Sequence, residues 1–175
     1  MSEQHLYNEE AKKKLRDLAE GIDIAMMETN LGAMPSHYFP MSTKDVDKDG
    51  YIWFLSNKNS EHNIHLNLDK NIQLVYAKPS DMQFMTVYGK ATITTERTIL
   101  AHYYEKTDDT WFNGIDDPNL SAIKVIPEDV HYWDTKNGKF VSLIKMGIGA
   151  MTGKTQDVGK KGDLNLEQND YPINH

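Results

Sequence analysis

Residues 56–60, which read Ser-Asn-Lys-Asn-Ser, are the stretch whose residue types and spacing could hold an anion. An apolar run, Tyr51 to Leu55, leads into these five small or polar residues, and the pattern predicts a short helix that begins after Ser60 and ends at Leu68. A helix N-terminus presents free backbone N–H groups and a partial positive charge, and serine hydroxyls add donors. The segment therefore predicts a phosphate cradle. An ordinary loop before a capped helix stays open as the alternative.

Two neighbouring patterns are typical of metal sites but incomplete. Residues 45–52, Asp-Val-Asp-Lys-Asp-Gly-Tyr-Ile, match the opening of a calcium loop, yet the twelfth position is Ser56, where a bidentate Glu is required. Asp and Gly in this order also make a hairpin turn, which the strands expected on both sides favour. His62 and His65 share a face of the expected helix, but two imidazoles lack a third ligand. We predict no metal site.

Composition excludes several classes of function. The 175-residue chain has no cysteine, which rules out disulfides, thiolate metal ligands and thiol catalysis and indicates a reducing, cytoplasmic setting. Its net charge of -7 argues against nucleic acid and anionic membranes as partners. The N-terminus has no signal-peptide pattern, and no window reaches the ~18 apolar residues that span a bilayer. No nucleophile-elbow, Walker or Gly-x-Gly-x-x-Gly motif occurs.

The elements expected around residues 56–60 are mostly strands. The pattern predicts strands at 22–28, 36–46, 51–55, 72–77, 82–95, 123–133 and 140–145, and helices at 8–19, 60–68 and 96–104. Pro40 places its strand at a sheet edge, and Pro127 is expected to interrupt another strand. Short strands joined by hairpins favour an antiparallel barrel or sandwich. We expect one mainly β domain over residues 1–150 and a flexible tail over residues 151–175.

Six short segments, taken in order, are similar to the FMN-binding split barrel of the pyridoxamine 5'-phosphate oxidase-like superfamily. The first two are Phe39-Pro40-Met41 and residues 50–57, Gly-Tyr-Ile-Trp-Phe-Leu-Ser-Asn, with Ser60 after them. The others are Gln73–Pro79, Thr86–Ala91, Trp111-Phe112 with Asp116–Pro118, and Pro127-Glu128 with Tyr132–Asp134. The resemblance runs from roughly residue 8 to 150 and is greatest to the bacterial general stress protein group of that superfamily.

The resemblance implies an antiparallel, Greek-key split barrel of six strands with short peripheral helices, a homodimer, and an FMN in each of two clefts between the subunits. It also implies that two strand ends line the flavin, with residues Phe39, Pro40, Met41, Phe54, Leu55, Ser56 and Asn57. Ser60 and His62 would lie at the flavin phosphate. From the other subunit, Phe84, Trp111 and Phe112 would approach the ring system.

Two positions depart from the family pattern. The arginine expected before Pro-Met is Phe39 here, and the lysine of the Ser-x-Lys motif is His62, with Glu61 between serine and histidine. Charge-assisted hydrogen bonds are worth roughly 1.5–3 kcal/mol each, so the loss of two would weaken phosphate binding by about two to four decades. The basic C-terminal motif of true pyridoxamine phosphate oxidases is also absent, so oxidation of vitamin B6 is not expected.

Two functions therefore stay open. One is a flavin-dependent oxidoreductase or flavin-binding stress protein with an unknown small-molecule substrate, in which the isoalloxazine supplies the redox chemistry. The other is a dimeric small-ligand binding or interaction protein that has lost tight flavin binding. No general acid or base stands out, and His37, Tyr38 and His62 are the residues to test.

Overall fold

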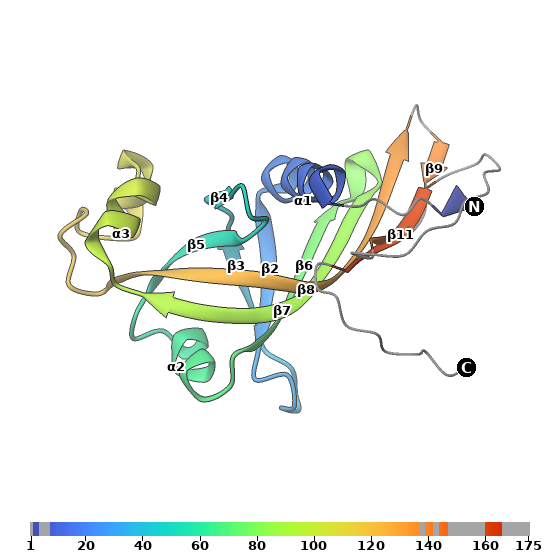
Figure 1. Ribbon diagram of the computed structural model, residues 1–175. Coiled ribbons are helices and arrows are strands. Elements are labelled where there is room, and N and C mark those ends of the chain that lie inside the picture. The colour runs from blue at the N-terminus through green and yellow to red at the C-terminus, as the bar shows by residue number, and fades with distance from the viewer. Residues whose placement is uncertain (1, 4–7, 137–138, 142–143, 147–159, 166–175) are drawn as a thin grey trace.

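The sheet of this protein is built on two long neighbouring strands, β7 (Gln83–Thr94) and β8 (Leu120–Lys136). The computed structural model describes residues 2–3, 8–136, 139–141, 144–146 and 160–165 (Figure 1). From β7 the sheet continues, antiparallel at each step, through β6 (Asn71–Lys78) and β2 (Ile24–Thr29) to β3 (Tyr38–Ser42). This curled antiparallel sheet confirms the predicted fold class, a mainly β split barrel with short helices.

Strand β8 is shared by two branches of the sheet. Its first part, residues 120–125, pairs with β5 (Ile52–Asn57), which in turn pairs with β4 (Asp45–Val46). Its second part, residues 129–134, pairs with β11 (Lys160–Asn165). Both β5 and β11 lie along the edge of β8 that faces away from β7, next to different parts of the strand (Figure 1). The other short strands are β1 (Ser2–Glu3), β9 (Lys139–Val141) and β10 (Ile144–Met146).

The helices form where the sequence predicts them. They are α1 (Asn8–Ile22), α2 (Glu61–Leu68) and α3 (Arg97–Tyr103), with two short 3-10 helices, η1 (Pro79–Asp81) and η2 (Lys106–Thr110). Helix α1 places Leu15 and Leu18, both fully buried, on the inner face of the sheet. None of the helices in the described ranges is long and apolar enough to cross a bilayer.

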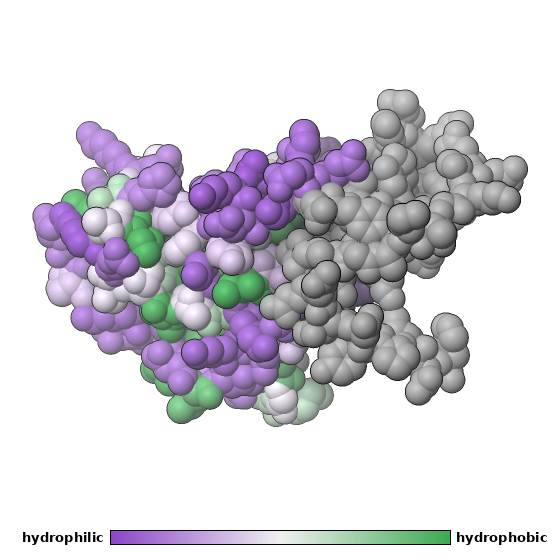
Figure 2. All heavy atoms as spheres, viewed as in Figure 1, coloured by the Kyte–Doolittle hydropathy of each residue, from purple (hydrophilic) through white to green (hydrophobic). Residues whose placement is uncertain are grey.

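Alternation along the strands builds the main core. The side chains of Ile72, Leu74 and Tyr76 on β6 are fully buried, and those of Met85 and Val87 on β7 meet them from the next strand. The period-2 pattern that predicted these strands is therefore the pattern of the core face. The face of the molecule seen in Figure 2 is mostly polar, with apolar side chains in separate groups.

A second, smaller core lies on the other face of β5. Trp53 and Leu55 pack there against Leu100 of α3 and Leu120 of β8. The indole of Trp53 stacks on the ring of Tyr103 with their centroids 4.8 Å apart. This satellite core fixes α3 and the segment that follows it against the first half of β8.

Two predictions on the strands need correction. Pro127 does not interrupt β8; the register shifts between Tyr88 and Gly89 on the facing strand, and the strand continues to Lys136. A β-bulge of this kind accommodates a residue that has no N–H to donate. The single strand expected at 36–46 is two strands, β3 and β4. The expected flexible tail contains β11, and its remaining residues lie outside the described part of the chain.

Other local predictions are confirmed. Pro40 lies in β3, an edge strand that pairs with β2 alone among the described strands. Residues 47–50 turn the chain between β4 and β5, and the N–H of Gly50 donates to the carbonyl of Asp47 at 2.9 Å. The Asp47 carboxylate also accepts from the N–H of Asp49 at 2.9 Å and from Trp53 Nε1 at 2.8 Å. The acidic residues of the calcium-like pattern thus cap a hairpin turn.

Candidate functional site

The site is centred on Ser56, at the end of β5, and on the first turn of α2. Ser60 is the N-cap of α2, and its Oγ accepts from the N–H of Asn63 at 3.4 Å, as the capping pattern predicts. Ser56 Oγ lies 2.8 Å from His62 Nε2 and 2.8 Å from Asn63 Oδ1. Ser56, His62 and Asn63 are all buried: they are 3%, 8% and 0% exposed.

The direction of each hydrogen bond follows from counting hydrogens. Ser121 Oγ donates its one hydrogen to the carbonyl of Ser56 at 2.8 Å, so it accepts from Asn63 Nδ2 at 3.0 Å. The amide oxygen of Asn63 therefore faces Ser56 Oγ, which donates its own hydrogen to it. Ser56 Oγ can then only accept from His62, so His62 carries its hydrogen on Nε2. The network is closed and joins β5, α2 and β8.

This network leaves one buried polar atom without a partner. His62 Nδ1 has no hydrogen-bond partner among the described residues. The Phe39 ring lies 5.0 Å from the imidazole, centroid to centroid, at an interplanar angle of 55°. Burial, with a smaller contribution from the nearby charge of His65, lowers the pKa of His62 against the opposing effect of Glu61. At neutral pH the ring is therefore uncharged, and Nδ1 is a bare acceptor.

Few cationic groups serve this segment. Lys58 is the one Lys or Arg in residues 56–63. Its backbone N–H donates to the carbonyl of Asn119 at 2.8 Å. The pKa of Asp117 is lowered by N–H groups of Asn113 and Asn119, and to a smaller extent by Lys58. The charge of Lys58 thus acts on Asp117, in the loop that precedes β8.

The first turn of α2 offers backbone donors instead. Of its leading N–H groups, that of Ser60 donates to the carbonyl of Asn57 at 2.9 Å and that of Asn63 is capped. The N–H groups of Glu61 and His62 are the ones left for a ligand within the described structure. The Glu61 carboxylate sits at this helix end, where the helix dipole stabilises a negative charge.

A small pocket adjoins this helix end. Its volume is about 90 Å³, and its lining residues are Thr29, Asn30, Ala33, His37, Glu61 and His65. Glu61 Oε1 lies 3.2 Å from His37 Nδ1 and 3.8 Å from His65 Nε2. His65 Nδ1 is 2.9 Å from Thr29 Oγ1. No group of three or more His, Cys, Asp or Glu in the described ranges has the geometry of a metal site.

The structure brings one part of the predicted flavin lining together. Phe39, Ser56, Ser60 and His62 share the cluster described above. Phe54 is fully buried in the main core and Leu55 packs in the satellite core, so the side chains of these two residues are used in packing. Within β3, Pro40 is exposed and Met41 packs at the edge of the core; Asn57 is exposed at the end of β5.

Of the residues predicted to approach from the other subunit, Phe84 lies apart from Trp111 and Phe112, which are adjacent in the chain. Phe84 is at the start of β7, opposite Trp133 of β8. Trp111 is 81% exposed in the segment after α3, beyond the far end of β7, which is about 37 Å long. Phe112 packs in the satellite core near Tyr104. One chain therefore does not bring Phe84 and Trp111 to one place.

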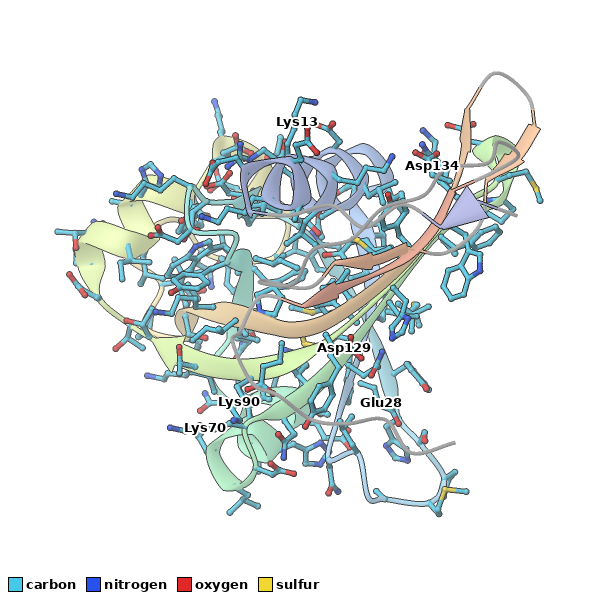
Figure 3. The ribbon with its side chains drawn as sticks, turned by 45° about the vertical axis from the view of Figure 1, so that its right-hand side comes forward. Lys13, Glu28, Lys70, Lys90, Asp129 and Asp134 are labelled. Carbon is cyan, nitrogen blue, oxygen red and sulfur yellow. The ribbon has the colours of Figure 1, made fainter. Side chains whose placement is uncertain are left out.

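Phe84 belongs to an apolar strip on the outer face of the sheet. The half-exposed or exposed apolar side chains of this strip belong to two neighbouring cross-strand rows. One row contains Pro40, Met26 and Val75 and continues into the polar Thr86 and His131. The other contains Ala77, Phe84 and Trp133, and Ile24 lies two residues before Met26 on the same face of β2. Glu28 of β2 lies beside the strip, in the cross-strand row that ends at Asp129 of β8 (Figure 3). A hydrogen bond to Glu28 raises the pKa of Tyr38, which leaves this phenol protonated and unsuited to act as a base.

Asn63 and Ser121 were missed from the sequence. Asn63 had a local signal, because it stands three residues after the N-cap, where the capping hydrogen bond ends. Ser121 had none, because the contact of its hydroxyl with Ser56 joins residues 65 apart in the chain.

Comparisons with known proteins agree with this architecture. The curated Protein bli-3 of Neurospora crassa is 25% identical over 164 residues, covering 77% of this chain and 77% of that protein. The structure of General Stress Protein 26 from Bacillus anthracis superposes with a TM-score of 0.60 at 20% identity, over 69% of this chain and 92% of that one. The structure of the general stress FMN/FAD binding protein from Xanthomonas citri superposes with a TM-score of 0.61 at 18% identity, over 82% of this chain and 97% of that one.

A profile of the family described as pyridoxamine 5'-phosphate oxidase like matches residues 10–157, which include the whole sheet from β2 to β8 and the cluster around Ser56 and His62. This match confirms the resemblance inferred from the short segments. The chain belongs to the pyridoxamine 5'-phosphate oxidase-like family.

Proposed function

We propose that this chain is a flavin-binding protein of the oxidoreductase type. The family resemblance implies FMN, and the isoalloxazine ring is the part of that cofactor which the site suits. The observation that carries the proposal is the end of β5 and the start of α2. Two backbone N–H groups, those of Glu61 and His62, stay open there beside the half-buried side chain of Phe39. The structural similarity to a protein named for FMN/FAD binding supports the same reading.

The ring system of FMN fits this site better than its phosphate group does. The half-buried Phe39 and Met41 suit the flat apolar ring system. A phosphate dianion would find neutral donors and the Glu61 carboxylate where relatives offer cations. When bound, the isoalloxazine would supply the electron transfer, and this chain would orient the ring and exclude water from it. His62 would hold a neutral Nε2–H toward Ser56 throughout.

We also propose that the chain works as a homodimer. The apolar strip on the outer face of β2, β6, β7 and β8 supports this, because exposed apolar strips of this kind mark interaction surfaces. Met26 is 39% exposed and Ile24 45% exposed within the strip. A second subunit would also be the source of the Trp111 and Phe112 side chains at the flavin. Sedimentation as a monomer would contradict the proposal.

A second function, binding of another small ligand without tight flavin binding, has one specific observation in its favour. Ser56 and Asn63, the polar side chains at the centre of the site, are already satisfied by each other and by Ser121. The experiment that separates the two functions is the absorbance spectrum of protein purified without added cofactor, followed by titration with flavin. Flavin bands, or saturable quenching of flavin fluorescence, support the first function; colourless protein that leaves micromolar flavin unquenched supports the second.

A further inference from the structure

We propose that the β5–α2 site selects flavin without a phosphate group, so that riboflavin binds more tightly than FMN. The inference rests on the proposed function, since it takes the start of α2 as the end that would face the phosphate. It concerns which flavin is bound, and it follows from the charges that surround this end.

The charges within residues 56–63 disfavour a phosphate group. Between residues 56 and 63, Glu61 is the one acidic residue and Lys58 the one Lys or Arg. Glu61 is half-exposed at the side chain, 53%, and stands at the first position of α2, beside the two open N–H groups. FMN carries close to two negative charges above pH 7, whereas riboflavin is neutral. Repulsion from Glu61 therefore acts on FMN alone.

The histidines next to this helix end are directed at Glu61. From the loop after β2, His37 directs Nδ1 to Glu61 at 3.2 Å, and from α2 itself His65 directs Nε2 to the same oxygen at 3.8 Å. Both imidazoles therefore face the Glu61 carboxylate. The two imidazoles nearest this helix end thus face a carboxylate and are not directed at a bound phosphate.

His62 does not provide a cation for a phosphate. Its Nε2–H is committed to Ser56, and its Nδ1 is a buried acceptor beside the Phe39 ring. An acceptor repels phosphate oxygens. A ribityl chain, which carries hydroxyl groups that donate as well as accept, matches a surface with open N–H donors, a serine hydroxyl and a carboxylate acceptor.

The test is a pair of fluorescence titrations, riboflavin and FMN, against the full chain at pH 8. We expect riboflavin to bind at least about tenfold more tightly, as a like-charge contact near the surface would produce. The preference should shrink as sodium chloride is raised, because salt screens the repulsion. FMN binding more tightly than riboflavin would overturn the inference and leave the proposed function standing. Failure of both flavins to bind would overturn both.

Two variants locate the cause. Glu61→Gln removes the negative charge and leaves one side-chain oxygen as an acceptor. It should raise FMN affinity about threefold to tenfold with little change for riboflavin. Asp69→Asn removes a carboxylate from the C-terminal end of the same helix, and the ratio of the two affinities should stay at the wild-type value. An unchanged ratio in Glu61→Gln, or an equal change in both variants, would overturn the inference.

Discussion

His62 Nε2 donates to Ser56 Oγ at 2.8 Å, and this bond ties the first turn of α2 to the end of β5. Because Ser56 gives its own hydrogen to Asn63, its hydroxyl has no donor left for a ligand. The segment predicted to be a phosphate cradle, residues 56–60, is therefore held by hydrogen bonds to the first turn of α2. The donors left for a ligand are the main-chain N–H groups of Glu61 and His62, because the side chains of Ser56, His62 and Asn63 bond to one another.

Removal of the Ser56 hydroxyl should destabilise the fold. Ser56→Ala leaves His62 Nε2–H and Asn63 Oδ1 buried without partners, and unsatisfied groups of this kind cost about 1–3 kcal/mol each. We expect a loss of about 2–4 kcal/mol in the free energy of unfolding, measured with urea. Ser80→Ala, at an exposed serine bonded to Asp81, is the control and should change it by less than about 0.5 kcal/mol. Equal stability of the two variants would show that the network carries little energy.

The bulge at Pro127 and Glu128 of β8 should depend on Gly89, which faces Pro127 from β7. A Cβ at this position would lie 2.2 Å from the carbonyl oxygen of Ile126, so the two strands would have to move apart. We expect Gly89→Ala to cost about 2–3 kcal/mol in urea unfolding. Gly21→Ala is the matched control, because no atom lies within 4 Å of its Cβ and alanine favours a helix; it should be neutral or stabilising. A tolerated Gly89→Ala would contradict the close approach.

Stability should fall in mild acid through His62. Burial lowers its pKa in the folded state, so the unfolded chain takes up a proton first as the pH drops below about 6.5. The stabilising contribution of the neutral ring is complete above that pH and is lost as the pH falls through the folded-state value. His62→Gln should therefore flatten the plot of unfolding free energy against pH between about 5 and 7. His102→Gln, at an exposed histidine, should leave the slope as in the wild type, and equal slopes in all three proteins would refute the assignment.

The outer strip should govern association. Met26→Lys places a charge between Pro40 and Val75, where a second subunit would desolvate it, and we expect the sedimenting species to change from dimer to monomer. Ile64→Lys, on the exposed face of α2, tests for a general effect of added lysine and should leave the dimer intact. A dimer that survives Met26→Lys would place the interface elsewhere.

Much of the fold was predictable because its signals are local. Buried alternation in β6 and β7, the Ser60 cap and the Asp47–Gly50 turn each operate within a few residues. The continuity of β8 through Pro127 was not predictable, because it depends on a bulge in β8 that forms against Gly89 of a distant strand.

The candidate site was predictable only in part, for the same reason. Ser56, Ser60 and His62 lie within one local pattern, and family resemblance added Phe39. The direction of the Ser56 hydroxyl depends on Ser121, which a distant strand supplies, and only the folded chain shows that the hydroxyl is already used. The separation of Phe84 from Trp111 likewise follows from the length of β7.

Two-dimensional amide NMR of the labelled full chain during a riboflavin titration tests the central claim most directly, because it reports both binding and its place. Saturable shifts concentrated in residues 39–41 and 56–62, with residues 97–103 of α3 unaffected, are the predicted result. Shifts confined to other parts of the chain, or no shifts at millimolar riboflavin, would contradict a flavin site between β5 and α2.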